Sequence, residues 1–301
     1  MDYYIGIDGH STYSRVVALS SEEKVLGRHM GNGVHLQNHR EKVKENLERL
    51  IIELNKMTST RLKECKGLCA SIAGVDTDED KEELENIFKQ MGVTCKIKIV
   101  SEQELILATH IRGEAGVAVF AGTGCYAYAK DAQGNTYRCG GYGYLIDDAG
   151  SGYSIGMQAI RYAFMSYDGR LPKTALEEKV RAHFSVEAIP DICDIIYSEQ
   201  FNRAKIADLV MAVKQAAEAG DQPATIIEQS SARELSLLAR SLIIRGKLQK
   251  GKVVLSGNVL LMNDRIQKTF IQLLKKDFPE IEVAATSEKP EMGAAFLAMN
   301  E

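Results

Sequence analysis

Two hydrophobic patterns follow one another along the first part of this chain. Short apolar or alternating runs predict β-strands at residues 3–7, 15–19, 67–73 and 96–100. Elsewhere apolar residues recur every three or four positions, which predicts amphipathic helices over residues 36–57, 78–91 and 104–111. Strands that alternate with helices are typical of an α/β fold, in which helices cover the faces of a sheet.

The pattern changes after residue 113, where the chain becomes mostly helical. An apolar strand at 117–121, an alternating strand and a glycine-dense loop open this part, and later strands are predicted at 252–256 and 281–284. The predicted helices cover residues 151–167, 174–184, 190–199, 203–219, 224–247, about 263–276 and 291–299. We therefore predict two domains, 1–113 and 114–301, the second more helical, with the last helix packing back on the first domain.

Composition narrows the range of functions. The chain has 301 residues, more than one hydrophobic core usually serves, and its formal net charge of −4 offers no basic surface for nucleic acid. No apolar run is long enough to cross a membrane, and the first residues carry no signal-peptide pattern, so we expect a cytoplasmic protein. Six cysteines are dispersed without the spacing of a metal site, and we expect free thiols.

Two short polar tips carry the most informative chemistry. Gly122-Thr123-Gly124 links two strands, and Asp8-Gly9-His10-Ser11-Thr12 links the first two strands of the chain. Glycines at a hairpin tip let backbone N–H groups approach an anion, and a threonine hydroxyl adds a donor. Taken alone, the first tip is also consistent with an ordinary turn. Two such tips in one chain suggest a duplicated nucleotide-binding domain and point to phosphoryl transfer.

Six short motifs, in order along the chain, resemble those of one known family. They are Asp8-Gly9-x-x-Thr12, Ala121-Gly-Thr-Gly124, Cys139-Gly-Gly-Tyr-Gly143, Asp148-x-Gly-Ser151, Ser256-Gly-Asn258 and Pro290-x-x-Gly-Ala294. On these motifs the chain resembles the BadF/BadG/BcrA/BcrD ATPase family, and within it the N-acetylglucosamine kinases of the actin-like ATPase, sugar kinase and heat-shock chaperone superfamily. The resemblance implies two actin-like, ribonuclease H-like α/β domains with ATP and Mg²⁺ in a cleft between them, and it favours a homodimer.

The resemblance also implies which residues hold the nucleotide. Asp8 would support the magnesium ion, directly or through water, and Gly257 with Asn258 would line the adenosine pocket. The full set of implied ATP-binding residues is Asp8, Gly9, Ser11, Thr12, Gly122, Thr123, Gly124, Gly257 and Asn258.

Two carboxylates are the implied catalytic residues. Glu102 stands where the family has an aspartate, and it would accept the proton of the attacking hydroxyl. Asp148 matches an aspartate that accepts a sugar hydroxyl. Both also fit a simpler role, because acidic residues stabilise and cap helix N-termini. The implied substrate-binding residues are Gly141, Tyr142, Asp148, Gly152 and His35. Of these, Tyr142 is also consistent with a core aromatic, and His35 with a surface histidine.

The resulting interpretation is ATP-dependent phosphoryl transfer to a hydroxyl of an amino sugar or other hexose. One alternative is a non-catalytic nucleotide or sugar sensor that keeps the kinase fold. Another is the ATPase activator of a dehydratase, which is disfavoured because Cys139 has no neighbouring cysteine to hold a shared iron–sulfur cluster. Several positions that match sugar contacts of the family are altered, so we expect N-acetylglucosamine to be a poor substrate. These positions are Val34, Ala73, Tyr144 and Ala149. The alternative is that nearby residues such as Asn32, His35 or Asn38 replace the lost contacts.

Overall fold

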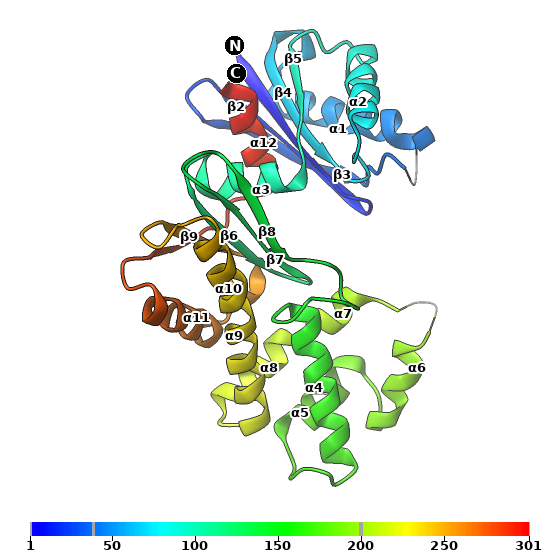
Figure 1. The fold of residues 1–301 in the computed structure, drawn as a ribbon. Helices are drawn as coiled ribbons and strands as arrows, with labels where there is room; N and C mark the ends of the chain where they lie inside the picture. Colours follow the sequence, from blue (N-terminus) through cyan, green and yellow to red (C-terminus); the bar gives the residue numbers. More distant parts are fainter. Residues whose placement is uncertain (1, 38–39, 199–200, 301) are drawn as a thin grey trace. The chain divides into compact units, whose positions relative to one another are not determined.

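The structure is a computed structural model that describes residues 2–37, 40–198 and 201–300 (Figure 1). The described residues form two compact units. Unit 1 contains the residues up to Gly113 together with those from Glu288 onward, and unit 2 runs from Glu114 to Ser287. Each unit holds a five-stranded sheet with helices packed on it, so the predicted α/β class is confirmed.

The sheet of unit 1 has the strand order β3-β2-β1-β4-β5. Its strands are β1 (Tyr3–Gly9), β2 (Tyr13–Ser20), β3 (Val25–Asn32), β4 (Cys65–Ile72) and β5 (Lys96–Ile99). β2 pairs antiparallel with β1 and β3, whereas β4 runs parallel to β1 and β5. The sequence pattern does not predict β3, because this edge strand has no buried residue and therefore no apolar run.

The helices of unit 1 are α1 (Arg40–Thr58), the 3₁₀ turn η1 (Leu62–Glu64), α2 (Asp78–Gln90), α3 (Glu102–Ile111) and α12 (Pro290–Met299). α1 buries one apolar stripe, made of Val43, Leu47, Leu50, Ile51 and Leu54. Within the described residues α1 begins later than the predicted residue 36. Leu36 is buried ahead of the helix and donates its N–H to the Ala73 carbonyl at 2.9 Å.

Helix α12 is C-terminal in sequence but packs within unit 1, against β1 and α3. Two backbone approaches there leave no room for a side chain. A Cβ on Gly6 of β1 would lie 2.1 Å from the Glu291 carbonyl oxygen, and a Cβ on Gly293 would lie 2.1 Å from Thr109 Oγ1. The two glycines therefore set the position of α12 beside the first hairpin.

The sheet of unit 2 repeats the topology of unit 1. Its strands are β6 (Gly116–Ala121), β7 (Cys125–Lys130), β8 (Thr136–Gly140), β9 (Lys252–Ser256) and β10 (Glu282–Ala285). The order is β10-β9-β6-β7-β8, with β6, β7 and β8 antiparallel and β9 parallel to both β6 and β10. Both sheets thus start with a three-stranded antiparallel meander and add two parallel strands beside its first strand, as a duplicated domain requires. β8 is an unpredicted strand, since it lies in the segment read as a glycine-dense loop.

Unit 2 carries most of the helices. They are α4 (Gly152–Tyr167), α5 (Ala175–Phe184), the 3₁₀ turn η2 (Ile189–Asp191), α6 (Ile192–Ile196), α7 (Arg203–Ala207), α8 (Val210–Glu218), α9 (Gln222–Arg245), α10 (Asn258–Met262) and α11 (Asp264–Asp277). The single helix predicted over 203–219 is two helices, because the chain turns at Asp208 and Leu209, where the Leu209 N–H bonds to the Ile206 carbonyl. The helix predicted over 190–199 is shorter, and residue 199 lies outside the described residues. Among the helices of the described residues, none has the length and apolar composition that crossing a bilayer requires.

Candidate active site

The β1–β2 hairpin of unit 1 presents a buried carboxylate with two basic partners. Asp8 is 3% exposed, and its Oδ2 lies 3.1 Å from His10 Nε2 and 4.0 Å from the nearer Arg15 guanidinium nitrogen. Burial alone would lower the pKa of His10, but the hydrogen bond and negative charge of Asp8 raise it above its ordinary value. Asp8 is therefore held in place by its neighbours and stands in a locally cationic setting.

The tip of this hairpin leaves its hydroxyl donors open. Ser11 and Thr12 are exposed, and within the described part of the chain neither hydroxyl has a protein partner. The tip backbone is fixed from behind: the Val34 N–H donates to the His10 carbonyl at 2.7 Å. A Cβ on Gly33 would lie 2.1 Å from the Ser11 carbonyl oxygen, so glycine is required for this contact. The result is a rigid tip with free donors, which suits an anion.

Glu102 is the first residue of α3 in unit 1 and is exposed. The capping of this helix is done by other residues: the Ser101 side chain accepts from the Glu104 N–H, and the Glu104 carboxylate accepts from the Ser101 N–H at 2.9 Å. Glu102 makes no hydrogen bond or ion pair with the described residues. Its carboxylate is therefore available to a ligand, although the helix N-terminus also favours its charge.

Val34 and His35, which follow the first sheet hairpins, are more buried than the sequence suggests. Val34 is 1% exposed and belongs to the hydrophobic core of unit 1, so its apolar character is not a lost substrate contact. His35 is half-buried and bridges to Ala73, with its ring over Gly74: a Cβ on that glycine would lie 2.5 Å from His35 Cε1. His35 is thus an oriented side chain, and its role as a substrate ligand stays a prediction.

The β6–β7 hairpin of unit 2 forms the second tip and is joined to helix α4. The Gly152 N–H donates to the Gly122 carbonyl at 2.7 Å, and the Tyr153 N–H donates to the Thr123 carbonyl at 3.1 Å. The tip carbonyls are thus turned toward α4. Within the described residues, the N–H groups of Thr123 and Gly124 and the Thr123 hydroxyl donate to no protein acceptor. Gly152 is buried and supports the tip, while the tip itself keeps donors for a phosphate.

Asp148 lies against this second tip. One of its carboxylate oxygens accepts the Cys125 N–H at 2.8 Å, and a Cβ on Gly124 would lie 3.3 Å from the same oxygen. Burial raises the pKa of Asp148, and the hydrogen bonds from Cys125 and Ser151 partly oppose that rise. Asp148 is therefore more than the helix cap considered from the sequence, because α4 is capped by the Ser151 side chain.

The segment Gly257-Asn258, which joins β9 to α10, also approaches the second tip. Gly257, between β9 and α10, has φ 86° and ψ 151°, a backbone conformation open essentially to glycine alone. A Cβ at this position would lie 2.3 Å from the Ala121 carbonyl oxygen, immediately before the Gly122–Gly124 tip. Asn258 is exposed at the start of α10. The structure therefore brings the predicted adenosine segment beside the predicted phosphate segment.

Tyr142 is 57% exposed, so the alternative of a core aromatic is wrong. The Arg138 guanidinium carbon lies 4.8 Å from the centroid of its ring, and the same guanidinium donates to the Gly140 carbonyl at 3.1 Å. Gly141 has φ +75° and packs on Tyr126, where a Cβ would lie 2.8 Å away. This loop presents an aromatic face that is steadied by one arginine.

One buried acid near the first tip is absent from the sequence-based set of site residues. Glu291 of α12 is 4% exposed, its Oε1 lies 3.9 Å from an Arg28 guanidinium nitrogen, and its Oε2 has no hydrogen-bond partner within the described residues. Burial raises the pKa of Glu291, and the charges of Arg15 and Arg28 oppose that rise. Only the spacing of the Pro290-x-x-Gly-Ala294 motif marks this residue in the sequence, since its position depends on α12 returning to β1.

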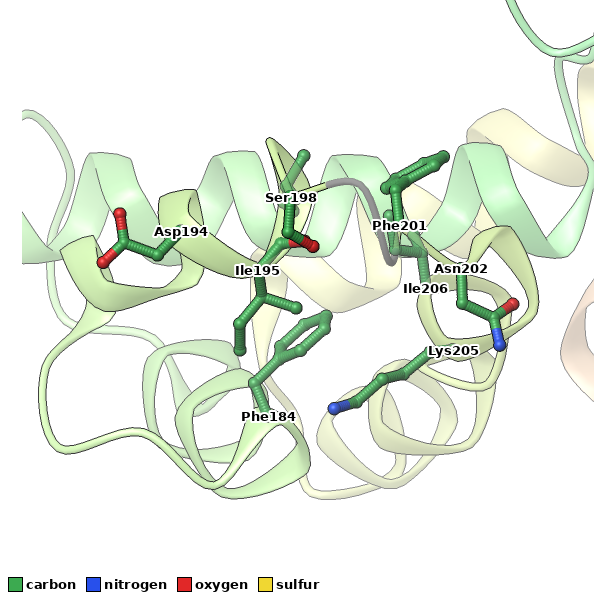
Figure 2. Close-up of a pocket in the computed structure, with 9 residues that line it drawn as sticks. Phe184, Asp194, Ile195, Ser198, Phe201, Asn202, Lys205 and Ile206 are labelled. Carbon is green, nitrogen blue, oxygen red and sulfur yellow. The ribbon is translucent and has the colours of Figure 1, made fainter.

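A separate cavity of about 420 Å³ lies among the small helices of unit 2 (Figure 2). Phe184 forms one wall, with the Lys205 ammonium nitrogen 5.3 Å from its ring centroid. None of the predicted site residues lines this cavity. Ser198 and Phe201 both line the cavity, and residues 199–200 between them lie outside the described residues. We therefore assign the cavity no role.

Two units of the same topology, each with a glycine-containing hairpin tip that offers free donors, define a duplicated α/β nucleotide-binding protein. Residues 5–298 match the BadF/BadG/BcrA/BcrD ATPase family, which is nearly the whole chain. The chain belongs to this family, as the resemblance of its motifs implies.

Curated relatives and solved structures agree with this assignment. The chain is 31% identical to an N-acetylmuramic acid/N-acetylglucosamine kinase of Clostridium acetobutylicum, over 100% of this chain and 99% of the relative. It is 26% identical to an N-acetyl-D-glucosamine kinase of Dictyostelium discoideum, over 99% of this chain and 98% of that protein. A crystal structure from Chromobacterium violaceum, named as a candidate N-acetylglucosamine kinase, superposes with a TM-score of 0.76 at 19% identity, covering 99% of both chains. This last similarity supports the fold.

Proposed function

We propose that this chain is an ATP-dependent kinase that phosphorylates a hydroxyl group of an N-acetylated amino sugar. Use of ATP follows from the family, and the acceptor class is supported by the names of the two full-length relatives. The observation that carries the proposal is the hydrogen bond from the Cys125 N–H, next to the Gly122–Gly124 tip, to the Asp148 carboxylate, since it ties the proposed hydroxyl acceptor to the proposed phosphate-binding loop. The earlier expectation against N-acetylglucosamine loses one of its supports, because Val34 is a core residue.

The proposed nucleotide contacts come from both tips. In unit 2, the free amides and hydroxyl of Thr123 and Gly124 hold one part of the triphosphate, and Gly257 with Asn258 lines the adenosine side. In unit 1, the Ser11 and Thr12 hydroxyls hold another phosphate group. Phosphoryl transfer needs little covalent chemistry from the protein, so positioning of this kind supplies most of the catalysis.

In the proposed reaction two carboxylates act on the acceptor. Asp148 accepts a hydrogen bond from a sugar hydroxyl and orients it. Glu102 accepts the proton of the attacking hydroxyl as its oxygen bonds to the γ-phosphorus and the bond to ADP breaks. Glu102 suits this role because its carboxylate has no partner among the described residues. Its extra methylene, relative to the aspartate of the family, changes the reach that the site must accommodate.

Asp8 is the residue that the family resemblance implies for magnesium, although the ion would compete with His10 and Arg15, which lie 3.1 and 4.0 Å from its Oδ2. Mg²⁺ usually keeps several waters and takes one or two carboxylates plus the phosphates of its substrate. Among the described residues no group of three His, Cys, Asp or Glu side chains is placed to hold a metal ion. Asp8 would hold the ion, which neutralises charge on the triphosphate when bound. The predicted homodimer and cytoplasmic location stay predictions.

The test is turnover with defined acceptors. The purified chain is given Mg-ATP and, separately, N-acetylglucosamine, N-acetylmuramic acid, glucosamine or glucose, with ADP release and the mass of the sugar product as readouts. We expect a phosphorylated product with at least one N-acetylated sugar, and loss of product in Glu102→Gln. ATP binding without any sugar product would contradict the kinase and support the alternative of a nucleotide sensor.

A further inference from the structure

A second cavity of unit 2, of about 620 Å³, adjoins the proposed acceptor residue. It is formed by the loop before α4 and by one face of that helix, and its lining includes Tyr144, Asp148, Ala149, Tyr153, Gln158 and Arg161. One lining residue is bonded to the second tip: the Tyr153 N–H donates to the Thr123 carbonyl at 3.1 Å. A sugar held here would therefore lie beside the proposed phosphate loop.

Arg161 is the unexplained charge of this cavity. It is exposed on α4, and within the described part of the chain its guanidinium makes no ion pair, hydrogen bond or ring contact. Ser154, Gln158 and Arg161 recur at helical spacing and line the same cavity. Side chains on a helix tilt toward its N-terminus, so the arginine leans along the cavity toward Asp148 rather than away from it.

Two carboxylates, Asp147 and Asp148, line the cavity together with Arg161. Asp148 accepts from the Cys125 N–H and is influenced by the positive charge of Arg203. Arg203 in turn lies with its guanidinium carbon 4.7 Å from the Tyr144 ring centroid. Ala149, at the cavity wall, adds neither charge nor bulk. The cavity thus has an acidic, hydroxyl-accepting end at Asp148 and an unpaired cationic group at Arg161.

We propose that Arg161 is a specificity residue that binds the carboxylate of an acidic acceptor sugar, while Asp148 holds a hydroxyl of the same molecule. This proposal rests on the proposed function and refines it: the acceptor site takes N-acetylated sugars that bear a carboxylate substituent, for which N-acetylmuramic acid is the probe. A planar guanidinium can form two parallel hydrogen bonds to a carboxylate, which adds geometric selectivity to charge. Tyr144 and Tyr153, with ring centroids 5.2 Å apart, supply apolar wall beside the sugar ring.

The test compares two sugars that differ by this acidic substituent. In Arg161→Met, kcat/KM for N-acetylmuramic acid should fall about ten- to a hundredfold, as expected when a charge-assisted hydrogen bond is lost. The kcat/KM for N-acetylglucosamine should stay within about twofold. Arg161→Lys should recover part of the loss, because lysine keeps the positive charge but cannot form two parallel hydrogen bonds to a carboxylate. Arg170→Met, at an exposed arginine paired with Asp168, is the matched control and should change neither value.

Calorimetric titration of both sugars without nucleotide keeps the proposal testable if turnover fails. Weaker binding of N-acetylmuramic acid alone in Arg161→Met supports it even when no sugar is phosphorylated, an outcome that would overturn only the kinase proposal. Equal losses for both sugars, unchanged values for both, or no binding of N-acetylmuramic acid to the unmodified chain would overturn the role of Arg161.

Discussion

The backbone N–H of Cys125 donates a 2.8 Å hydrogen bond to a carboxylate oxygen of Asp148. Cys125 is the first residue after the Gly122–Gly124 tip, and Asp148 lies in the loop before α4. This bond fixes the proposed hydroxyl acceptor relative to the proposed phosphate loop with no mobile side chain between them. Any change that moves one of the two groups is therefore expected to move the other, so the nucleotide and sugar sites of unit 2 should respond together.

Gly124→Val tests this coupling. A Cβ at Gly124 would already lie 3.3 Å from the Asp148 carboxylate, and the two γ-carbons of valine would displace it. We expect the dissociation constants of both Mg-ATP and the sugar to rise about tenfold or more, because phosphate and hydroxyl contacts lose their alignment. Calorimetry measures both constants, and circular dichroism checks that the fold is retained.

The control for this variant is Ala132→Val, which adds carbon atoms at the exposed turn between β7 and β8 of the same meander. It should leave both constants unchanged. Normal ATP binding in Gly124→Val would remove this tip from the nucleotide site. A loss of ATP binding with unchanged sugar binding would keep the tip in the nucleotide site but show that the Cys125–Asp148 bond does not couple the two ligands.

Glu102→Gln isolates the proposed proton acceptor. The amide keeps the size of the side chain but accepts a proton far less readily, so kcat should fall roughly 10²-fold or more while the sugar dissociation constant changes little. Glu104→Gln is the matched control, two residues along the same helical turn. Glu104 caps the helix, so this variant should affect stability slightly and kcat hardly at all. Full activity of Glu102→Gln would move the assignment to Asp147 or Asp148.

Gly257→Ala tests the Gly257-Asn258 segment through both the free energy of unfolding and the affinity for ATP. Alanine is disfavoured at φ 86° and ψ 151° by about 1–3 kcal/mol, and its Cβ would also meet the Ala121 carbonyl oxygen at 2.3 Å. We expect a lower free energy of unfolding in urea and weaker ATP binding. Asn258→Ala should weaken ATP binding with unchanged stability, since this exposed side chain has no protein partner among the described residues. Equal stability of Gly257→Ala and the unmodified chain would contradict the close approach.

The repeated tips made the duplication predictable, because each tip lies between strands with clear apolar patterns. β3 and β8 escaped prediction for the opposite reason: β3 is an edge strand with no buried residue, and β8 is half exposed beside the glycine loop. The order of strands in each sheet could not be predicted from the hydrophobic patterns. For example, the parallel pairing of β9 with β6 joins segments separated by most of unit 2.

The proposed site residues also differ in whether local sequence or tertiary packing reveals them. Residues within a tip, such as Thr123 and Gly124, can be proposed as phosphate ligands from local spacing, because the donors of a tip are neighbours in sequence; their role stays a prediction. Glu291 reaches the neighbourhood of Arg28 only when α12 packs on β1, and Arg161 lines the same cavity as Asp148 only because both border one face of α4. Val34 shows the converse error, in which matching a motif position implied a ligand contact where the fold places a core residue.

Glu228 offers a prediction about stability against pH that is independent of the proposed function. It is 1% exposed on α9, accepts the Asn263 side-chain N–H at 2.6 Å and lies 3.1 Å from the half-exposed Arg265 guanidinium. Burial raises its pKa above the ordinary value, although Asn263 and Arg265 oppose the rise. Between the ordinary and the raised pKa, the folded chain binds more protons than the unfolded chain. The free energy of unfolding must therefore fall as pH rises through that window, by at most about 1.4 kcal/mol per pH unit for one group.

Glu228→Gln removes this titration and keeps an acceptor for Asn263. Urea denaturation from pH 4 to pH 8 should show the variant gaining stability relative to the unmodified chain as pH rises above about 4.5, the range in which a glutamate ordinarily ionises. Glu234→Gln on the same helix is the control, because Glu234 has no ion pair or hydrogen bond within the described residues. It should show no such trend. A difference that instead grows in favour of the unmodified chain as pH rises would mean that Arg265 outweighs burial and that the pKa of Glu228 is lowered.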